Sequence, residues 1–450
     1  MGFIDSSVTA VALPAIRVSL NASLEQAQWI SGAYLLTLSA LVLIGGALAD
    51  GLGIARVFAA GILFFVLGSL ACSAAQGPGQ LIAARAFQGL AAGIMVPGSM
   101  ALVARAFPKS ERGRALGLWA AATTATTALG PVVGGALLSL GGSEVWRLIF
   151  AMNLPLGLAS LALLWRYATP DRGRPGTPID WLGAMLATLG LGGMAWGLTS
   201  TGGESLAALG LGLVVFAGFL AWERICPAPM IRLGMFANRA FAAANLATFL
   251  LYVSITGIGF YLPMTAMSAW GQSPIDVTLA LLPTSVLIAL LSAPVGRLAD
   301  RIGPFVPMAA GAGIVAVAQF GLVLVAAAPD FWLEIFPLTV LSGFGIALVV
   351  APLTIAVMAE AADDEQGAAS GINNVVARAA TLVAVALLGR IAAMGYGPQG
   401  EGVPGFGLPS ATPAHVAATG QAFAAMAGVA AICALASAIV SGLRIRRRPS

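Results

Sequence analysis

Charged side chains are scarce in this sequence of 450 residues, where Asp, Glu, Lys and Arg together make up 9%. A typical soluble domain carries about 25% charged residues. Apolar residues make up 59%, and the mean hydropathy is +0.94. So few polar side chains cannot cover the surface of a water-soluble globule. The composition excludes a soluble fold, a disordered chain, collagen and a coiled coil, and it predicts an all-α polytopic membrane protein.

Cysteine and histidine are almost missing too. The three cysteines lie far apart, and His415 is the only histidine. A disulfide framework or a zinc site needs more such residues at close spacing. The 22 basic residues include one lysine and are scattered singly, which excludes a nucleic-acid surface. Since no nucleophile–base pair appears either, we expect no enzyme activity, no cofactor and no metal.

Long apolar runs fill the sequence instead. A helix needs about 20 apolar residues to cross about 30 Å of hydrocarbon, and fourteen runs qualify as candidate spans. They are 1–16, 29–49, 55–75, 81–104, 114–138, 148–165, 179–199, 206–222, 241–264, 277–294, 305–328, 331–358, 371–389 and 419–440. The first supplies only 16 residues, so we expect it to be truncated and the natural start to lie upstream of Met1.

The basic residues predict the orientation of these spans. If the N-terminus is inside, the inner loops and tail hold 17 basic residues and the outer loops hold three, Arg17, Arg147 and Arg390. Basic residues concentrate on the cytoplasmic side of membrane proteins. We therefore expect both termini in the cytoplasm, with the basic tail Arg444–Arg448 anchored on anionic lipid. The high content of Ala, Gly and Arg is typical of a bacterial genome, so the expected location is a bacterial plasma (inner) membrane.

An internal repeat divides the chain. The string GALADGLG at 46–53 returns as GRLADRIG at 296–303, an offset of 250 residues that corresponds to eight spans. Two six-helix bundles in parallel repeat, with two helices between them, are the construction of a class of secondary transporters. The predicted domains are an N-terminal bundle at 1–165, two linker helices with cytoplasmic loops at 166–240 and a C-terminal bundle at 241–450.

Four further motifs stand at defined spans: Ile4–Pro14, Leu81–Gly89, Gly130–Gly135 and Trp146–Pro155. With the repeated loops they resemble, in order and over essentially the whole chain, the major facilitator superfamily and specifically its fourteen-helix drug:proton antiporter branch. The resemblance implies a proton-coupled exporter of small amphipathic molecules that works by alternating access. The first loop departs from the pattern, because Gly51, Ile54 and Ala55 stand where bases are usual, and Thr126 replaces an expected glycine.

Asp5 is the first residue that we expect to take part in proton coupling. If Ile16 marks the outer end of the first span, Asp5 lies eleven residues inward, or about 16 Å at 1.5 Å per residue. An ionised carboxylate near the middle of a membrane is costly and usually functional. Thr9, one turn away, is expected to share its hydrogen bonding. The alternative is a structural acid, bonded to hydroxyls or solvated near the inner surface.

Arg85, in the fourth span, is the second candidate for proton coupling, because it can hold a carboxylate charged or repel a proton. The alternative is that its side chain extends to the outer surface. Gln88, Asn374 and Arg378 are assigned to the substrate cavity. Arg378, near mid-depth in the thirteenth span, is expected to contact polar substrate groups or to pair with Asp5; the alternative is a strut within its bundle.

Two more sites are expected to control movement. Gly130, Pro131, Gly134 and Gly135 form the antiporter hinge, since Pro131 cannot donate a backbone hydrogen bond and glycine permits close helix approach; the alternative is an ordinary kink. The loops of the repeat form a cytoplasmic gate of helix caps and salt bridges that hold one access state. Its residues are Gly46, Asp50, Gly53, Arg56, Gly296, Arg297, Asp300, Arg301 and Gly303.

Two other functions compete with export. A facilitator or proton symporter that imports a small nutrient has the same fold, but Asp5 and Gly130–Pro131 favour export. A membrane scaffold or sensor is disfavoured, because this sequence holds no soluble domain or long tail. The expected partners are a small-molecule substrate, protons and membrane lipid, with the protein acting as a monomer; some exporters of this branch also work with a periplasmic adaptor.

Overall fold

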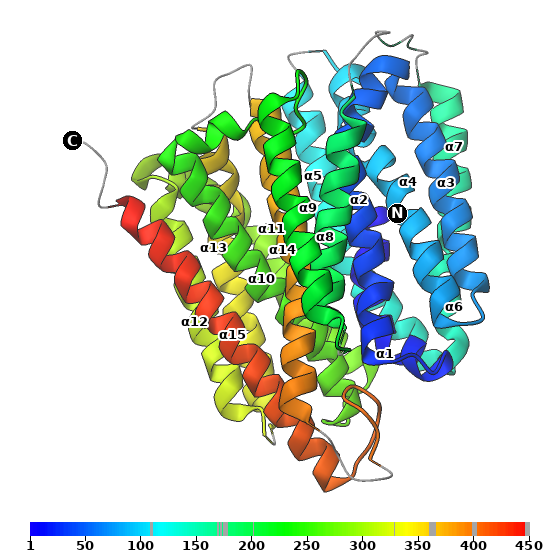
Figure 1. The fold of residues 1–450 in the computed structure, drawn as a ribbon, viewed down its shortest axis with the longest axis vertical. Helices are drawn as coiled ribbons and strands as arrows, with labels where there is room; N and C mark the ends of the chain where they lie inside the picture. Colours follow the sequence, from blue (N-terminus) through cyan, green and yellow to red (C-terminus); the bar gives the residue numbers. More distant parts are fainter. Residues whose placement is uncertain are drawn as a thin grey trace. The chain divides into compact units, whose positions relative to one another are not determined.

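The computed structural model describes residues 1–108, 111–168, 171, 173, 179–200, 202–327, 329–359, 366–397 and 403–445. In these ranges the chain is helical and contains no strand (Figure 1). The helices up to residue 231 are α1 (Gly2–Ser19), α2 (Leu24–Leu52), α3 (Ile54–Ala74), α4 (Pro78–Ala106), α5 (Arg112–Leu140), η1 (Ser143–Val145), α6 (Trp146–Ala151), α7 (Asn153–Tyr167), α8 (Trp181–Thr199) and α9 (Ser205–Ile225). The later helices are η2 (Leu233–Ala237), α10 (Arg239–Ser268), α11 (Pro274–Ile302), α12 (Phe305–Val325), η3 (Phe331–Ile335), α13 (Phe336–Met358), α14 (Gln366–Tyr396) and α15 (Pro413–Ile445).

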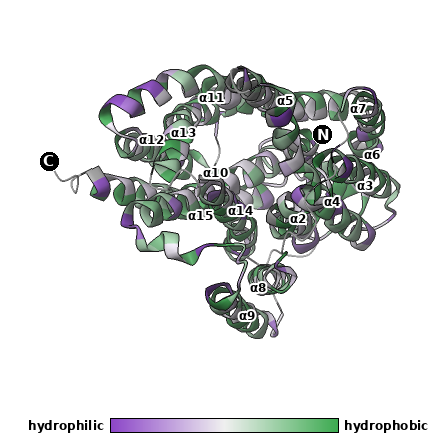
Figure 2. Ribbon diagram, turned by 90° about the horizontal axis from the view of Figure 1, so that it is seen from above, coloured by the Kyte–Doolittle hydropathy of each residue, from purple (hydrophilic) through white to green (hydrophobic). Residues whose placement is uncertain are grey.

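Each predicted apolar run falls largely within a helix, and hydrophobic residues dominate these helices in Figure 2. Within the described ranges, eleven helices are long and apolar enough to cross a membrane, or twelve if the bent helix α2 is one span. From α1 and α5 only the shorter segments Ser7–Ser19 and Leu129–Ser139 qualify as apolar helices. The all-helical polytopic fold is confirmed, whereas the count of fourteen spans is not. Residues 446–448 of the predicted lipid anchor lie outside the described part of the chain.

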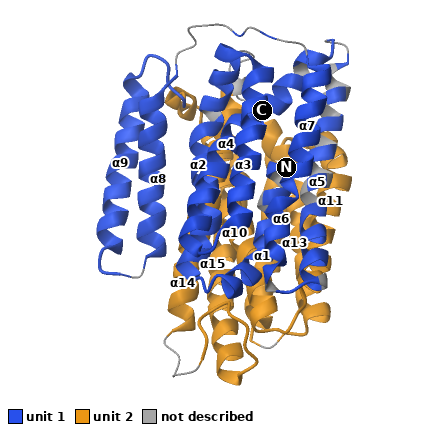
Figure 3. Cartoon of the chain, turned by 90° about the vertical axis from the view of Figure 1, so that its right-hand side faces the viewer, with its two compact units in different colours: residues 1–231 blue, residues 232–450 orange. Residues whose placement is uncertain are grey.

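The chain forms two compact units, Met1–Ile231 (unit 1) and Arg232–Ser450 (unit 2), which Figure 3 colours separately. Within unit 1, α2 and α3 pack on α4, α1 packs on α5, and α3 packs on α7. Within unit 2, α11 and α12 pack on α13, α10 packs on α14, and α12 packs on α15. The repeat in the sequence is therefore matched by a repeat of helix packing.

Helices α8 and α9 pack on each other, and α8 also packs on α2. These contacts group the two helices with unit 1, which ends at Ile231, whereas the sequence suggested a separate linker at 166–240. The hairpin lies between the two repeated bundles in the chain but is structurally an addition to the first of them.

The second helix of each unit begins and ends in the same way. Ser23 before α2 and Ser273 before α11 each accept a hydrogen bond from the third residue of the helix, and that residue's side chain bonds back to the serine. This capping box satisfies backbone donors that a helix start leaves unpaired. Both helices end at a glycine with positive φ, Gly53 at +102° and Gly303 at +88°, where a side chain would be strained.

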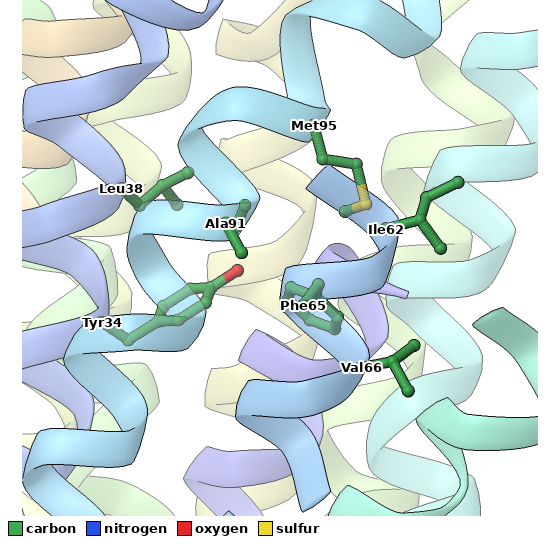
Figure 4. Packing of buried hydrophobic residues seen from close by; sticks show 8 residues of the cluster. Tyr34, Leu38, Ile62, Phe65, Val66, Ala91 and Met95 are labelled. Carbon is green, nitrogen blue, oxygen red and sulfur yellow. The ribbon is translucent and has the colours of Figure 1, made fainter. Parts of the chain in front are cut away.

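A cluster of buried apolar side chains joins α2, α3 and α4 in unit 1 (Figure 4). It contains Tyr34, Leu38, Ile62, Phe65, Val66, Ala91, Ala92 and Met95. Packing of this kind excludes water and fixes the three helices against one another. Tyr34 belongs to the cluster and also lies against the polar site described next, so apolar packing and the polar site are continuous.

Candidate functional site

A buried ion pair lies at the centre of unit 1. A guanidinium nitrogen of Arg85, on α4, donates to Oδ2 of Asp5, on α1, and the two side chains are 1% and 0% exposed. The same nitrogen donates to Oε1 of Gln88 at 2.5 Å, and Nε donates to the carbonyl of Ile30 at 3.1 Å. Arg85 therefore holds Asp5 and is itself fixed by α2 and its own helix.

Two amides complete the surroundings of the carboxylate. Oδ1 of Asp5 accepts hydrogen bonds from Nε2 of Gln88 at 3.0 Å and from Nδ2 of Asn153 at 3.1 Å. Both amides also donate to Oγ of Ser69, at 2.7 and 3.2 Å. Because a buried charge is tolerated only when it is paired and hydrogen-bonded, this network from α1, α3, α4 and α7 explains how Asp5 is accommodated.

Aromatic rings enclose the cation. The ring centroid of Tyr34 lies 4.2 Å from the guanidinium carbon of Arg85, and that of Phe150 lies 5.7 Å away. A ring face attracts a cation and replaces part of its hydration. These rings therefore help to hold Arg85 in its place.

At this site the structure differs from two expectations and from one alternative. Arg85 does not extend to a surface, since it is 1% exposed. Thr9 donates to the main-chain carbonyl of Asp5 at 2.6 Å and not to the carboxylate. Gln88, assigned to the substrate cavity, is 0% exposed and belongs to the ion-pair network.

Sequence reasoning missed Ser69, Asn153 and Tyr34. Asn153 was visible as a lone amide in an apolar run, inside a motif that had been noted without a role. Ser69 and Tyr34 carry no such signal, because serine and tyrosine are common in membrane helices. Their role depends on which way each helix faces.

The glycines of the predicted hinge lie against α1. A Cβ atom on Gly130 would be 2.2 Å from Oγ of Ser7, and one on Gly134 would be 2.6 Å from a methyl group of Val8. Gly135 is buried, and Pro131 lies inside α5, which is helical from Arg112 to Leu140. The absence of side chains at the first two positions is what allows α5 to pack on the helix that carries Asp5.

The predicted cavity residues of unit 2 lie on α14. Asn374 lines a cavity of about 190 Å³ between α10, α13 and α14, together with Tyr252 and Asn373. Asn373 donates to Oδ1 of Asn245 at 3.2 Å and to Oγ1 of Thr248 at 2.8 Å. Arg378 lies one turn beyond Asn374 on the same helix.

The gate loop of unit 1 is held by an acid that the sequence analysis did not select. Asp171 accepts hydrogen bonds from the backbone N–H groups of Ile54 (2.7 Å) and Ala55 (3.4 Å) at the start of α3, and it pairs with Arg105. Its partial burial tends to raise the pKa of Asp171, but these N–H groups and the guanidinium outweigh that effect and hold the pKa below its usual value.

The charged residues that were predicted to form salt bridges at the gate form none with the described residues. Asp50 and Arg56 are exposed and form no ion pair with any described residue, and the same holds for Arg297, Asp300 and Arg301 in unit 2. Gly46 and Gly296 are partly exposed. Of the predicted gate residues, Gly53 and Gly303 have a clear structural role, because their positive φ makes the turn.

Comparisons with known proteins agree with this architecture. A family model of the Major Facilitator Superfamily matches residues 1–385 and 244–450. An uncharacterised transporter of this type from Mycobacterium tuberculosis is 31% identical over 387 residues, which cover 84% of this chain and 65% of that protein. The tetracenomycin C resistance and export protein of Streptomyces glaucescens is 30% identical, over 88% of this chain and 74% of its own.

A crystal structure supports the same fold. The inward-facing, unoccupied bacterial homologue of the human lysosomal transporter Spinster superposes with a TM-score of 0.72 at 17% identity, over 100% of this chain and 96% of that one. The chain spans 65% of the mycobacterial relative's length. The matches along the whole sequence establish that this multi-pass membrane protein is a transporter and not an enzyme, and that it belongs to the Major Facilitator Superfamily.

Proposed function

We propose that this transporter exports small amphipathic molecules, such as antibiotics, from the bacterial cytoplasm in exchange for protons. The observation that carries the proposal is the buried Asp5–Arg85 pair. An ion pair is a poor way to stabilise a buried core, because desolvation offsets its attraction, so its presence favours a functional role. A relative at 30% identity is named as a resistance and export protein.

Proton binding at Asp5 is the central step of the proposed mechanism. When Asp5 takes a proton from the outer side, it loses its negative charge and its attraction for Arg85 falls. The guanidinium keeps its contacts with Gln88, the Ile30 carbonyl and the Tyr34 ring. When the proton leaves to the cytoplasm, the pair forms again and the cycle is complete.

The conformational and substrate steps use the other predicted residues. Since α5 contacts α1 through Gly130 and Gly134, a shift of α1 on protonation is transmitted to α5. The cavity beside Asn374, with Arg378 one turn away, supplies both apolar and polar contacts for an amphipathic molecule. The protein acts in the plasma (inner) membrane with both termini in the cytoplasm. It needs neither a second copy nor a periplasmic adaptor for proton binding, since the whole network lies within unit 1.

Proton release in inverted membrane vesicles tests the proposal. Vesicles that contain the protein and an internal pH-sensitive dye receive lipophilic cations and neutral drugs in turn. We expect substrate-evoked proton release from the vesicles, its loss in Asp5→Asn, and its retention in Glu204→Gln. The control acid is exposed at the start of α9.

Two results would change the proposal. No proton release with any compound, together with substrate uptake into intact cells, would contradict export and favour a facilitator or a symporter. Proton release that persists in Asp5→Asn would still support export, but it would assign proton binding to another residue.

A further inference from the structure

Two acids lie buried at one end of the α8–α9 hairpin. Asp180 immediately precedes α8 and Glu223 lies in the last turn of α9, and the two residues are 8% and 3% exposed. The two helices pack directly on each other. Buried carboxyl groups of this kind are rare unless they are paired, and neither takes part in the Asp5 network.

One oxygen of each carboxyl group has ordinary partners. Oδ1 of Asp180 accepts from the backbone N–H of Gly183 at 2.8 Å and from the indole N–H of Trp222 at 2.9 Å. Oε2 of Glu223 accepts from the backbone N–H of Ile231 at 2.7 Å. The other two oxygens, Oδ2 of Asp180 and Oε1 of Glu223, are buried and accept no hydrogen bond.

These two unpartnered oxygens lie on either side of the position that a side chain at Gly183 would occupy. A Cβ on Gly183 would be 2.2 Å from Oδ2 of Asp180 and 2.8 Å from Oε1 of Glu223. Both oxygens therefore border the same small space beside Gly183 and are at most about 5 Å apart, the sum of these two distances. Glycine at this position is what leaves room for both.

Among the described residues, the surroundings of the pair hold no basic side chain bound to either acid. Neither acid forms an ion pair with a described arginine or lysine, and Arg224, next to Glu223, is exposed. Helix α8 carries no charge, and α2, which packs on it, carries only the acids Glu25 and Asp50. The remaining titratable neighbour is Cys226, where burial first and then the two acids raise the pKa of the thiol.

We propose that Asp180 and Glu223 share one proton and form a second proton-binding site, separate from Asp5. A proton bonded to one of the two unpartnered oxygens donates to the other, so a single hydrogen bond satisfies both. Two ionised carboxylates this close in a buried place repel each other strongly, and holding one proton between them removes that repulsion. A metal cation would need more oxygen ligands than these two.

The shared proton would hold together the helix ends that lie close to the last residue of unit 1. It joins the start of α8 to the end of α9, and Glu223 also holds the backbone of Ile231, the last residue of unit 1. At neutral pH the folded protein keeps this proton, whereas the separate carboxyl groups of the unfolded chain have already lost theirs. Stability therefore falls as the pH rises and the pair loses its proton.

Infrared spectroscopy of the full-length protein tests this site. A protonated carboxyl group shows a carbonyl stretch distinct from that of a carboxylate. We expect the wild-type spectrum at neutral pH to contain one such band that is lost in both Asp180→Asn and Glu223→Gln and retained in Glu204→Gln. Asparagine can still cap α8 and accept from Trp222, and its N–H can donate to Glu223, so folding of this variant should be preserved.

A second measurement follows thermal unfolding against pH. The wild type and Glu204→Gln should lose stability toward alkaline pH, while Asp180→Asn should lose less because only one ionisable group remains. Identical infrared spectra for wild type and Asp180→Asn would overturn the proposal, as would a band that appears only after sodium and potassium are removed, which would indicate a cation site. Neither measurement depends on transport activity. The proposed proton exchange through Asp5 can therefore be disproved while the proposed Asp180–Glu223 site remains supported.

Discussion

Units 1 and 2 repeat the same helix packing but bury different polar groups. Unit 1 encloses a charged pair, Asp5 and Arg85, with amides around it. In unit 2, the residue 250 positions after Ser69 is Gln319, which is 1% exposed and accepts from Oγ of Ser254 at 2.6 Å. Other polar contacts of unit 2 join amides and hydroxyls, as between Asn373, Asn245 and Thr248 and between Thr256 and Thr381, or join His415 to Tyr396.

The comparison separates what the fold requires from what the function requires. Both units need buried polar groups to be hydrogen-bonded, and at the position equivalent to Ser69 the neutral side chains of Ser254 and Gln319 meet that need in unit 2. Since this part of the packing is repeated without an ion pair, the ion pair of unit 1 is not a condition for building such a bundle. The predictions below test this difference.

The largest expected effect is the loss of Arg85. Arg85→Ala leaves Asp5 buried without its cation, which should cost about 3–5 kcal/mol of unfolding free energy. Gln319→Leu removes one neutral hydrogen bond and should cost about 1–2 kcal/mol. Denaturant unfolding of the purified protein measures both, and equal losses would contradict the distinction between the units.

The next effect concerns the contact between α1 and α5. Gly130→Val would place methyl groups where Ser7 and Val8 now lie, and overpacking of this kind costs about 1–3 kcal/mol. The matched control is Gly210→Val on α9, because no atom lies within 4 Å of a Cβ there. We expect reduced stability and transport in the first variant only. Normal transport by Gly130→Val would show that this close approach is dispensable.

A smaller difference should separate the two loops of the repeat. Gly53→Ala and Gly303→Ala both force a side chain into positive φ, which costs about 1 kcal/mol or more. Only at Gly53 would the new methyl group also meet Asp171, whose backbone and side-chain oxygens lie 2.7 Å away. Gly53→Ala should therefore lower the unfolding temperature further. Equal shifts would mean that Asp171 can move aside without cost.

The smallest effect is the pH dependence of that same loop. Because hydrogen bonds and Arg105 lower the pKa of Asp171, its stabilising contribution is complete above the usual carboxyl pKa. The contribution is lost as the pH falls through the lowered value. Asp171→Asn, which can still cap α3, should cost about 1 kcal/mol or less at neutral pH. The two proteins should converge in acid, as unfolding measured over a pH series would show.

The sequence predicted the helices and the repeated turns better than it predicted the contacts between side chains. The strings at 46–53 and 296–303 correctly marked equivalent turns, because glycine at positive φ leaves a signature in any sequence. Asp5 and Arg85 were each selected, since a charge in an apolar run is conspicuous. Their pairing was not predicted, since the carboxylate that Arg85 would hold was left unnamed and Arg378 was offered as a partner for Asp5. Residue spacing gives depth along a helix and not the direction in which a side chain points.

Three acids were missed for a related reason. Asp171, Asp180 and Glu223 stand in loops or at helix ends, where acids are usually solvated, so nothing in the sequence marked them. Their partners are backbone N–H groups, the guanidinium of Arg105 and the indole of Trp222, and Asp171 and its partner Ile54 stand 117 positions apart in the sequence. Such contacts depend on how a loop folds back on a helix, which composition and periodicity do not encode.

The tight contact of α5 on α1 determines how large a movement of α1 the proposed proton coupling would need. Gly130 and Gly134 face Ser7 and Val8, the turn directly after Asp5, with no side chain of α5 between the two backbones. A layer of flexible side chains could absorb a displacement of a few tenths of an ångström, whereas backbone packed to this density has little compressibility. A shift of α1 smaller than the length of a covalent bond would therefore reach α5 almost undiminished.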